Sequence, residues 1–212
     1  MANHMANPWL NVPLTDYENH MNSAGVEQSA ALSALFAEAL AHCQPESVAV
    51  IGVAGGNGLD RIDSSVTRRM LGIDINPAYL DAVRQRYGQM PGLELMCADL
   101  NERIDGCRPV QLVHAALVFE HAGTGACLDN VLSLVADGGS ISVVLQLPSD
   151  TTPGVSKSQF ASMQILSAGF TIIDPTWLRA MIEARGFHIV RESRRALPAG
   201  KAFWMGIFAR AC

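Results

Sequence analysis

The sequence alternates short runs rich in β-branched residues with longer amphipathic stretches of helical length. The expected strands span residues 47–53, 69–74, 93–97, 110–116, 139–147, 187–195 and 202–210, and the expected helices 24–42, 77–87, 125–136 and 175–185. This alternation is typical of βαβ units, whose strands pair in parallel. Only the turn LPAG separates the last two strands, so we expect these to be antiparallel. The sequence therefore predicts a single α/β domain with a doubly wound, mostly parallel seven-stranded sheet.

Two of the expected helices have clear start signals. Asn76-Pro77 and Asp174-Pro175 each place a capping side chain before a proline of the first turn. Gly186 marks the end of the second of these helices. The topology also requires a helix from about 58 to 66, which we expect although the apolar spacing there is weak.

Composition and charge narrow the class of partner. The 212 residues are 49% hydrophobic and 17% charged, which describes a compact globule, and the net charge of −5 opposes nucleic acid. The start has no basic segment followed by an apolar core, and no run approaches the ~20 apolar residues of a membrane span. Five scattered cysteines without a C-x-x-C pair suit a reducing compartment. We expect a cytoplasmic monomer or homodimer with neither a membrane nor a nucleic-acid partner and no metal.

A glycine-rich turn and two acids follow three successive strands. The strand VAVI runs into residues 52–58, where small residues let a ligand approach backbone N–H groups. Asp74 closes the second strand, 22 residues after Gly52, where a carboxylate can accept hydrogen bonds from ribose hydroxyls. Asp99 follows the third strand and can accept from an adenine amine. Together they predict a nucleoside site.

These residues resemble the class I S-adenosylmethionine-dependent methyltransferases over residues 45–147, with a looser similarity to residue 210. LVHAALVFEHAG is similar to the family's fourth-strand segment, and LVADGGSISVV to its L-x-P-G-G stretch. The resemblance implies a Rossmann-like fold with an antiparallel C-terminal strand, S-adenosyl-L-methionine as cofactor, and methyl transfer to a small-molecule acceptor. Two positions depart from the family's acid-x-G-x-G-x-G loop: Val50 replaces the acid and Ala54 the second glycine.

The resemblance also implies which residues contact the cofactor. Asp74 matches the ribose acid and Asp99 the adenine-side acid. Because Val50 cannot hold the amino-acid end of the donor, backbone groups near Gly52 and Ala115 are expected to do so. The expected cofactor-binding residues are Gly52, Val53, Ala54, Gly56, Asn57, Asp74, Ile75, Asp99, Leu100, Ala115 and Leu117.

Methyl transfer from a sulfonium is an in-line displacement, so alignment can supply most of the catalysis. A hydroxyl or thiol acceptor benefits from a base. The candidates are His121, which follows the fourth strand, and Tyr17 with His20, which share a face if DYENHM is helical. His114 lies inside an apolar strand and is predicted to be a core histidine.

Two segments fit no βαβ unit. Residues 1–23 are expected to form a lid over the donor, mobile without ligand, and residues 24–212 the methyltransferase domain. Within that domain, residues 148–173 are expected to form an insertion on the acceptor side. Polar and apolar residues mix around this insertion as in a pocket wall: Gln146, Ser149, Lys157, Ser158, Gln159, Phe160 and Met163.

Two other functions stay open. The glycine loop also satisfies G-x-x-x-G-x-G, the pattern of NAD(P)-dependent short-chain oxidoreductases. Their chemistry needs a tyrosine with a lysine four residues later, because the lysine charge lowers the pKa of the phenol. The residues four after the three tyrosines are Met21, Val83 and Pro91, so that pair is absent. A catalytically silent nucleoside-binding protein is the other alternative.

Overall fold

The computed structural model describes residues 7–149, 154–155 and 158–211. Its strands are β1 (Ser47–Ile51), β2 (Arg69–Asp74), β3 (Leu93–Cys97), β4 (Val110–Ala116), β5 (Val135–Gln146), β6 (Phe187–Ala196) and β7 (Ala202–Arg210). They form one sheet in the order β3-β2-β1-β4-β5-β7-β6. The first five pair in parallel, and β7 inserts antiparallel between β5 and β6. This arrangement confirms the predicted mixed sheet with an antiparallel last strand.

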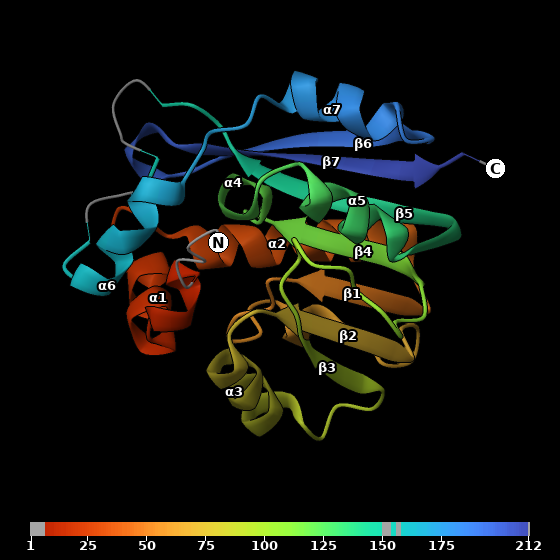
Figure 1. Cartoon of the computed structure of the whole chain (residues 1–212), viewed down its shortest axis with the longest axis horizontal. Helices are drawn as coiled ribbons and strands as arrows, with labels where there is room; N and C mark the ends of the chain where they lie inside the picture. Colours follow the sequence, from red (N-terminus) through yellow and green to blue (C-terminus); the bar gives the residue numbers. More distant parts are fainter. Residues whose placement is uncertain (1–6, 150–153, 156–157, 212) are drawn as a thin grey trace, which may run out of the picture.

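Helices cover both faces of the sheet (Figure 1). One face carries α2 (Gln28–Cys43) and α3 (Pro77–Tyr87), and the other α4 (Phe119–Ala122), α5 (Ala126–Ser133) and α7 (Pro175–Glu183). Side chains of a strand alternate between its faces. Within β1, Val48 and Val50 therefore pack in the core with α2, whereas Ala49 and Ile51 pack in the core with α5 and α7. The result is a doubly wound three-layer domain.

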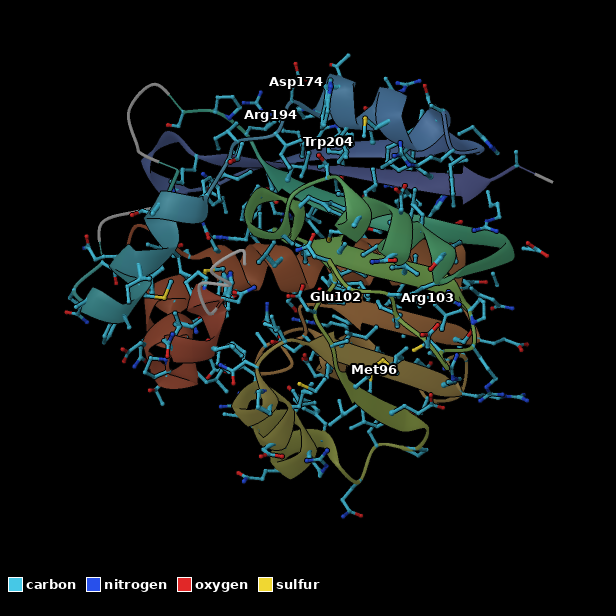
Figure 2. The ribbon with its side chains drawn as sticks, viewed as in Figure 1. Met96, Glu102, Arg103, Asp174, Arg194 and Trp204 are labelled. Carbon is cyan, nitrogen blue, oxygen red and sulfur yellow. The ribbon has the colours of Figure 1, made fainter. Side chains whose placement is uncertain are left out.

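The expected helix caps are present. The Asn76 side chain accepts a hydrogen bond from the Ala78 amide (3.0 Å), and Asp174 accepts one from the Thr176 amide (2.8 Å). Figure 2 shows Asp174 beside the start of α7. Each cap satisfies one of the amides that a helix start leaves without a partner.

Some predicted boundaries were wrong. The helix expected over 58–66 is only a single 3₁₀ turn, η2 (Leu59–Arg61). The Asp63 carboxylate accepts from both the amide and the hydroxyl of Ser65, and such local bonds compete with helix formation. The helix predicted from residue 24 begins at Gln28, because Gly25 and Glu27 have φ angles of +81° and +47°. The first strand ends at residue 51 instead of 53, the fifth begins at 135 instead of 139, and the helix expected over 125–136 spans 126–133.

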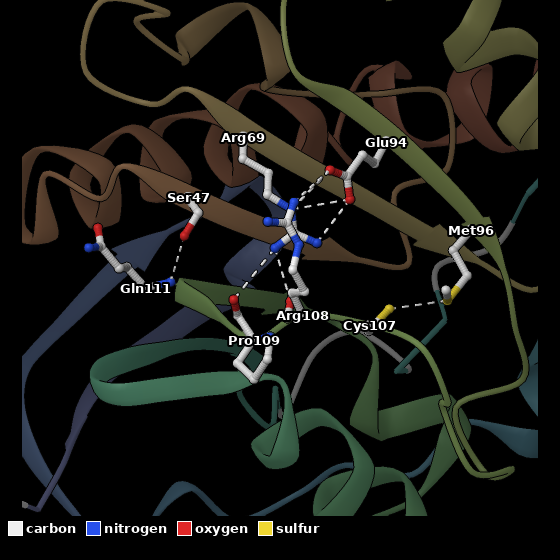
Figure 3. A network of polar contacts seen from close by, with 8 residues as sticks. All are labelled: Ser47, Arg69, Glu94, Met96, Cys107, Arg108, Pro109 and Gln111. Carbon is white, nitrogen blue, oxygen red and sulfur yellow. Dashed lines mark hydrogen bonds and ion pairs between the residues drawn. The ribbon is translucent and has the colours of Figure 1, made fainter.

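A polar network ties the amino ends of the strands together (Figure 3). The Arg69 guanidinium pairs with Glu94 (2.9 Å) and donates to the Arg108 carbonyl (2.9 Å). The Gln111 amide donates to the Ser47 hydroxyl (3.0 Å). These contacts link β1, β2, β3 and β4 at the edge of the sheet opposite to the carboxyl ends.

Two segments outside the βαβ units meet at the carboxyl edge, where Figure 1 shows α1 and α6 beside each other. We call residues 7–23 and 158–170 the cover. They contain η1 (Pro8–Asn11), α1 (Leu14–Asn22), α6 (Ala161–Gln164) and η3 (Ile165–Gly169). Their apolar side chains form a small cluster of their own: Trp9, Val12, Tyr17, Phe160, Met163 and Leu166. The Ser162 hydroxyl donates to the Asp16 carboxylate (2.5 Å), which joins the two parts.

Within the described ranges, no helix is both long and apolar enough to cross a membrane. The described cysteines Cys43, Cys97, Cys107 and Cys127 are free thiols. Across the same residues, no group of three histidine, cysteine or acidic side chains could hold a metal ion.

Candidate functional site

A cavity lies beneath the cover, along the carboxyl ends of the parallel strands. It extends from Asp74 and Asp99, after β2 and β3, to Gln146 at the end of β5 and Lys201 just before β7. It encloses about 1090 Å³ of space, its open mouth included. In open α/β sheets ligands bind outside the carboxyl ends of the strands, so this cavity is the candidate functional site.

The turn after β1 forms one wall of the cavity. Gly52 has a φ of +64°, and a Cβ there would lie 3.2 Å from a methyl group of Val118. Ala54 adopts a left-handed φ of +46°, a conformation that glycine tolerates better than alanine. Its amide donates to the Asp74 carboxylate (2.9 Å), which fixes the turn. Alanine is therefore accommodated where a glycine was expected.

The Asp74 carboxylate lies beside this turn with only 8% of the residue exposed. One oxygen accepts from the Ala54 amide and the other from the Asn76 amide, each at 2.9 Å. Burial raises the pKa of Asp74, while these hydrogen bonds oppose the shift. Each oxygen can accept a further bond, so the carboxylate can bind a pair of hydroxyl groups in the cavity. Asp99 lines the same end and accepts from the Asn101 amide (2.9 Å).

Aromatic rings of the cover and of α4 form the roof. The Trp9 ring meets Tyr17 edge to face at 5.7 Å and His121 at 4.9 Å between centroids. His121 in turn meets Phe170 at 5.1 Å. The Trp9 carbonyl accepts from the Asn76 side chain (2.9 Å), which attaches the roof to the strand end that carries Asp74.

No protein-family model and no curated protein matches the sequence, but the fold of the chain matches solved structures. The chain is similar to a Burkholderia thailandensis 1,6-didemethyltoxoflavin-N1-methyltransferase with 1,6-didemethyltoxoflavin and S-adenosylhomocysteine bound (TM-score 0.67, 16% identity, 100% of this chain and 94% of that chain). It is also similar to the magnesium protoporphyrin IX methyltransferase ChlM from Synechocystis PCC 6803 with S-adenosylhomocysteine bound (TM-score 0.67, 12% identity, 93% of this chain and 94% of that chain). The chain has the class I methyltransferase fold. The chain is similar to the [4+2]-cyclase SpnF too (TM-score 0.63, 10% identity, 83% of this chain and 80% of that chain). The methyltransferase fold therefore does not by itself determine the reaction.

On this methyltransferase fold, seven of the expected cofactor-binding residues line the cavity. They are Gly52, Ala54, Asp74, Ile75, Asp99, Leu100 and Leu117. The other four lie elsewhere. Val53 and Ala115 are buried in the two cores, Gly56 lies against the Tyr87 ring, and the Asn57 side chain donates to the Ser29 carbonyl (2.9 Å). Residues after Ala115, namely Ala116 to Val118, line the cavity in its place.

The three expected catalytic residues come together in the cavity. Tyr17 and His20 lie on one face of α1, as their spacing predicted, and His121 lies on α4. Burial lowers the pKa of His121 to about 4. Burial, and to a smaller extent the positive charge of Lys201, also lowers the pKa of His20. Burial and the charge of Asp74 raise the pKa of Tyr17 to about 12. At neutral pH both imidazoles are therefore uncharged and the phenol keeps its proton.

Gln28, Gln146 and Lys201 form a polar cluster at the far end of the cavity, and the sequence predicted only part of it. Gln146 and Met163 were expected in a pocket wall and do line the cavity, whereas Lys157 lies outside the described residues. Gln28 and Lys201 were not singled out for the site. The available signal was that Lys201, one of only two lysines, precedes the apolar run AFWMGIF.

His114 lies outside the cavity. Its Nδ1 is 3.2 Å from the Ser142 hydroxyl, and its ring stacks on Phe36. Burial lowers its pKa to about 3. The structure confirms the predicted core histidine.

Proposed function

We propose that the chain is an S-adenosylmethionine-dependent methyltransferase that acts on a small molecule. The observation that carries this proposal is the buried Asp74 carboxylate on the cavity wall, joined to the turn after β1 and followed by Asp99 after the next strand. An acid in this position binds the hydroxyls of a ribose. Two similar structures hold S-adenosylhomocysteine, the product of the same donor.

The residues present fit this cofactor. Asp74 would hold the ribose, Asp99 the adenine amine, and the backbone around Gly52 and Leu117 the amino-acid end. Val50 is buried in the core and offers no carboxylate to the donor's ammonium group, so that contact depends on backbone carbonyls. We expect a donor site whose affinity comes mainly from the nucleoside half.

The cofactor supplies an activated methyl group on a sulfonium. The protein's part is to align the acceptor with that group and to exclude water, which the roof of aromatic rings favours. Tyr17 can donate a hydrogen bond but is a poor base, because its pKa is raised to about 12. The neutral imidazoles of His20 and His121 each have a nitrogen lone pair that can accept a proton, and burial, which lowers the pKa of both, weakens them as bases.

We also propose how the chain is organised around this reaction. Residues 1–23 serve as the lid and residues 148–173 as the acceptor-side insertion of a methyltransferase domain over 24–212. The contacts between the two parts of the cover support this division. The enclosed cavity and the net charge of −5 favour a small acceptor over nucleic acid. A cytoplasmic location and a monomeric or homodimeric state remain part of the proposal.

Calorimetric titration with S-adenosylhomocysteine and with NADPH tests the cofactor. We expect saturable binding of the first and none of the second. The reverse result would replace the methyltransferase by an oxidoreductase.

Turnover tests the reaction itself. Incubation of a cell extract with the protein and a methyl-labelled donor should transfer label to a small molecule, which mass spectrometry identifies. Donor binding without any labelled product would favour a catalytically silent protein or a different reaction on the same fold.

A further inference from the structure

Lys201 lies at the end of the cavity away from Asp74. It precedes β7, which is four strands along the sheet from β2. Neighbouring strands are about 4.8 Å apart, so the strand ends that carry Lys201 and Asp74 are separated by roughly 19 Å. If Asp74 holds the donor's ribose, as the proposed function requires, Lys201 belongs to the acceptor end of the cavity.

The groups of the described residues that contact the Lys201 ammonium are neutral. Its Nζ donates to the Gly154 carbonyl at 2.8 Å and lies 3.5 Å from the Gln146 side-chain oxygen. No carboxylate oxygen of the described residues lies within 4.0 Å of Nζ. Only 3% of the residue is exposed. A cation that is buried without a counter-ion is costly, and proteins retain few of them.

The neighbouring polar groups support the cation without neutralising it. The Gln28 side chain donates to the same Gln146 oxygen (3.4 Å). Behind Gln146, the Glu120 carboxylate accepts from the Gln146 backbone amide (2.8 Å). Burial lowers the pKa of Lys201 to about 8, so the side chain is mostly protonated at neutral pH.

Apolar side chains lie near Lys201 as well. Phe170 of the cover lies against Gly154, whose carbonyl accepts from Lys201, and Val155, Met163 and Leu166 line the same cavity. An acceptor that fits this end therefore needs an apolar body and one group that complements a positive charge.

We propose that Lys201 binds an anionic oxygen of the acceptor, and that the substrates are small organic acids with an apolar, ring-sized body. This inference rests on the proposed function for the direction of the cavity. The anion supplies the counter-charge that none of the described residues provides, and Gln28 and Gln146 can donate to its second oxygen. A neutral acceptor of the same shape would leave the ammonium buried without a counter-ion.

A matched pair of probes tests the charge preference. Benzoate and benzamide have the same size and differ in the anionic group. We expect benzoate to bind the chain at least tenfold more tightly than benzamide, measured by calorimetry at pH 7 with and without saturating S-adenosylhomocysteine. Equal affinities would overturn the inference.

Substitution locates the preference. Lys201→Met should abolish the advantage of benzoate over benzamide, whereas Arg103→Met, at an exposed cation outside the cavity, should keep it. Both variants should bind S-adenosylhomocysteine within twofold of the wild type. A Lys201→Met variant that keeps the preference, or that loses donor affinity while folded, would contradict an acceptor role for this lysine.

Direct observation of the ammonium does not depend on a variant that folds. Selective ¹⁵N labelling of lysine gives at most two side-chain signals, because the chain has two lysines. Benzoate should shift the signal of Lys201 saturably and benzamide should not; an unmoved signal would overturn the inference. If the wild type does not bind S-adenosylhomocysteine, the proposed function fails instead, and the probes without donor still decide whether Lys201 is an anion site.

Discussion

At the scale of single residues, Asp74 has two tasks: its oxygens hold the turn after β1, and they line the cavity. Asp74→Asn keeps the size of the side chain but removes the charge and replaces one accepting oxygen by an NH2 group, so we expect affinity for S-adenosylhomocysteine to fall by at least about 1.5–3 kcal/mol, the usual contribution of hydrogen bonds to a charged group. Calorimetry measures this loss. Asp81→Asn, at an exposed acid of α3, is the matched control and should bind as the wild type does. Unchanged affinity in Asp74→Asn would remove this residue from the donor site.

Glu120 makes stability depend on pH. One of its oxygens has no hydrogen-bond partner among the described residues, and burial raises its pKa from 4.5 to about 7. The folded state therefore keeps a proton that the unfolded chain has already released, so this residue destabilises the fold progressively as the pH rises from about 4.5 through 7. The penalty reaches about 3 kcal/mol above pH 7.

Glu120→Gln removes this penalty, and its side-chain oxygen can still accept from the Gln146 amide. We expect the variant and the wild type to have similar free energies of unfolding near pH 4.5, with the variant more stable by up to about 3 kcal/mol at pH 8. Urea unfolding at several pH values measures the difference. Glu102→Gln, on the surface, is the control. Parallel pH profiles for the wild type and Glu120→Gln would show that Glu120 titrates normally.

At the scale of elements, the two parts of the cover are joined by the hydrogen bond from Ser162 to Asp16. Loss of this bond should let α1 separate from α6 more often. We expect Ser162→Ala to speed amide hydrogen exchange over residues 14–22 several-fold, as local opening becomes less costly. Ser167→Ala, which removes a hydroxyl bonded to the Gln164 carbonyl in the same part of the cover, should leave that exchange unchanged. Equal rates in both variants would mean that apolar packing alone joins the cover.

The elements also show how far the sequence could predict the site. The turn after β1 and the acids Asp74 and Asp99 were predictable, because each follows directly from the end of its own strand. The roof and the far end were less so, since contacts such as Gln28 with Gln146 join residues 118 positions apart. The sequence also predicted that Ala115 contacts the cofactor, whereas the next residue, Ala116, lines the cavity. Side chains alternate between the two faces of β4, and that of Ala115 points into the core.

For the molecule as a whole, a ligand that binds only the folded state raises its stability by mass action. At a concentration of 100 times its Kd, S-adenosylhomocysteine should add about 2.7 kcal/mol. For a chain of this size that corresponds to a rise of roughly 5–10 °C in the melting temperature. Thermal unfolding with and without the ligand measures it. Asp74→Asn at the same ligand concentration should show a smaller rise, and an equal rise would point to binding elsewhere.

The place of β7 has a consequence for synthesis. This strand lies between β5 and β6, although it follows both in the chain. While the protein is being made, β6 therefore has no neighbour to pair with until β7 has left the ribosome. A nascent chain that stops before residue 201 can already contain the turn after β1, Asp74 and Asp99. It still lacks the strand that completes the sheet and the lysine beside it, so under the proposed roles the donor end of the cavity would be synthesised before its Lys201 end is complete.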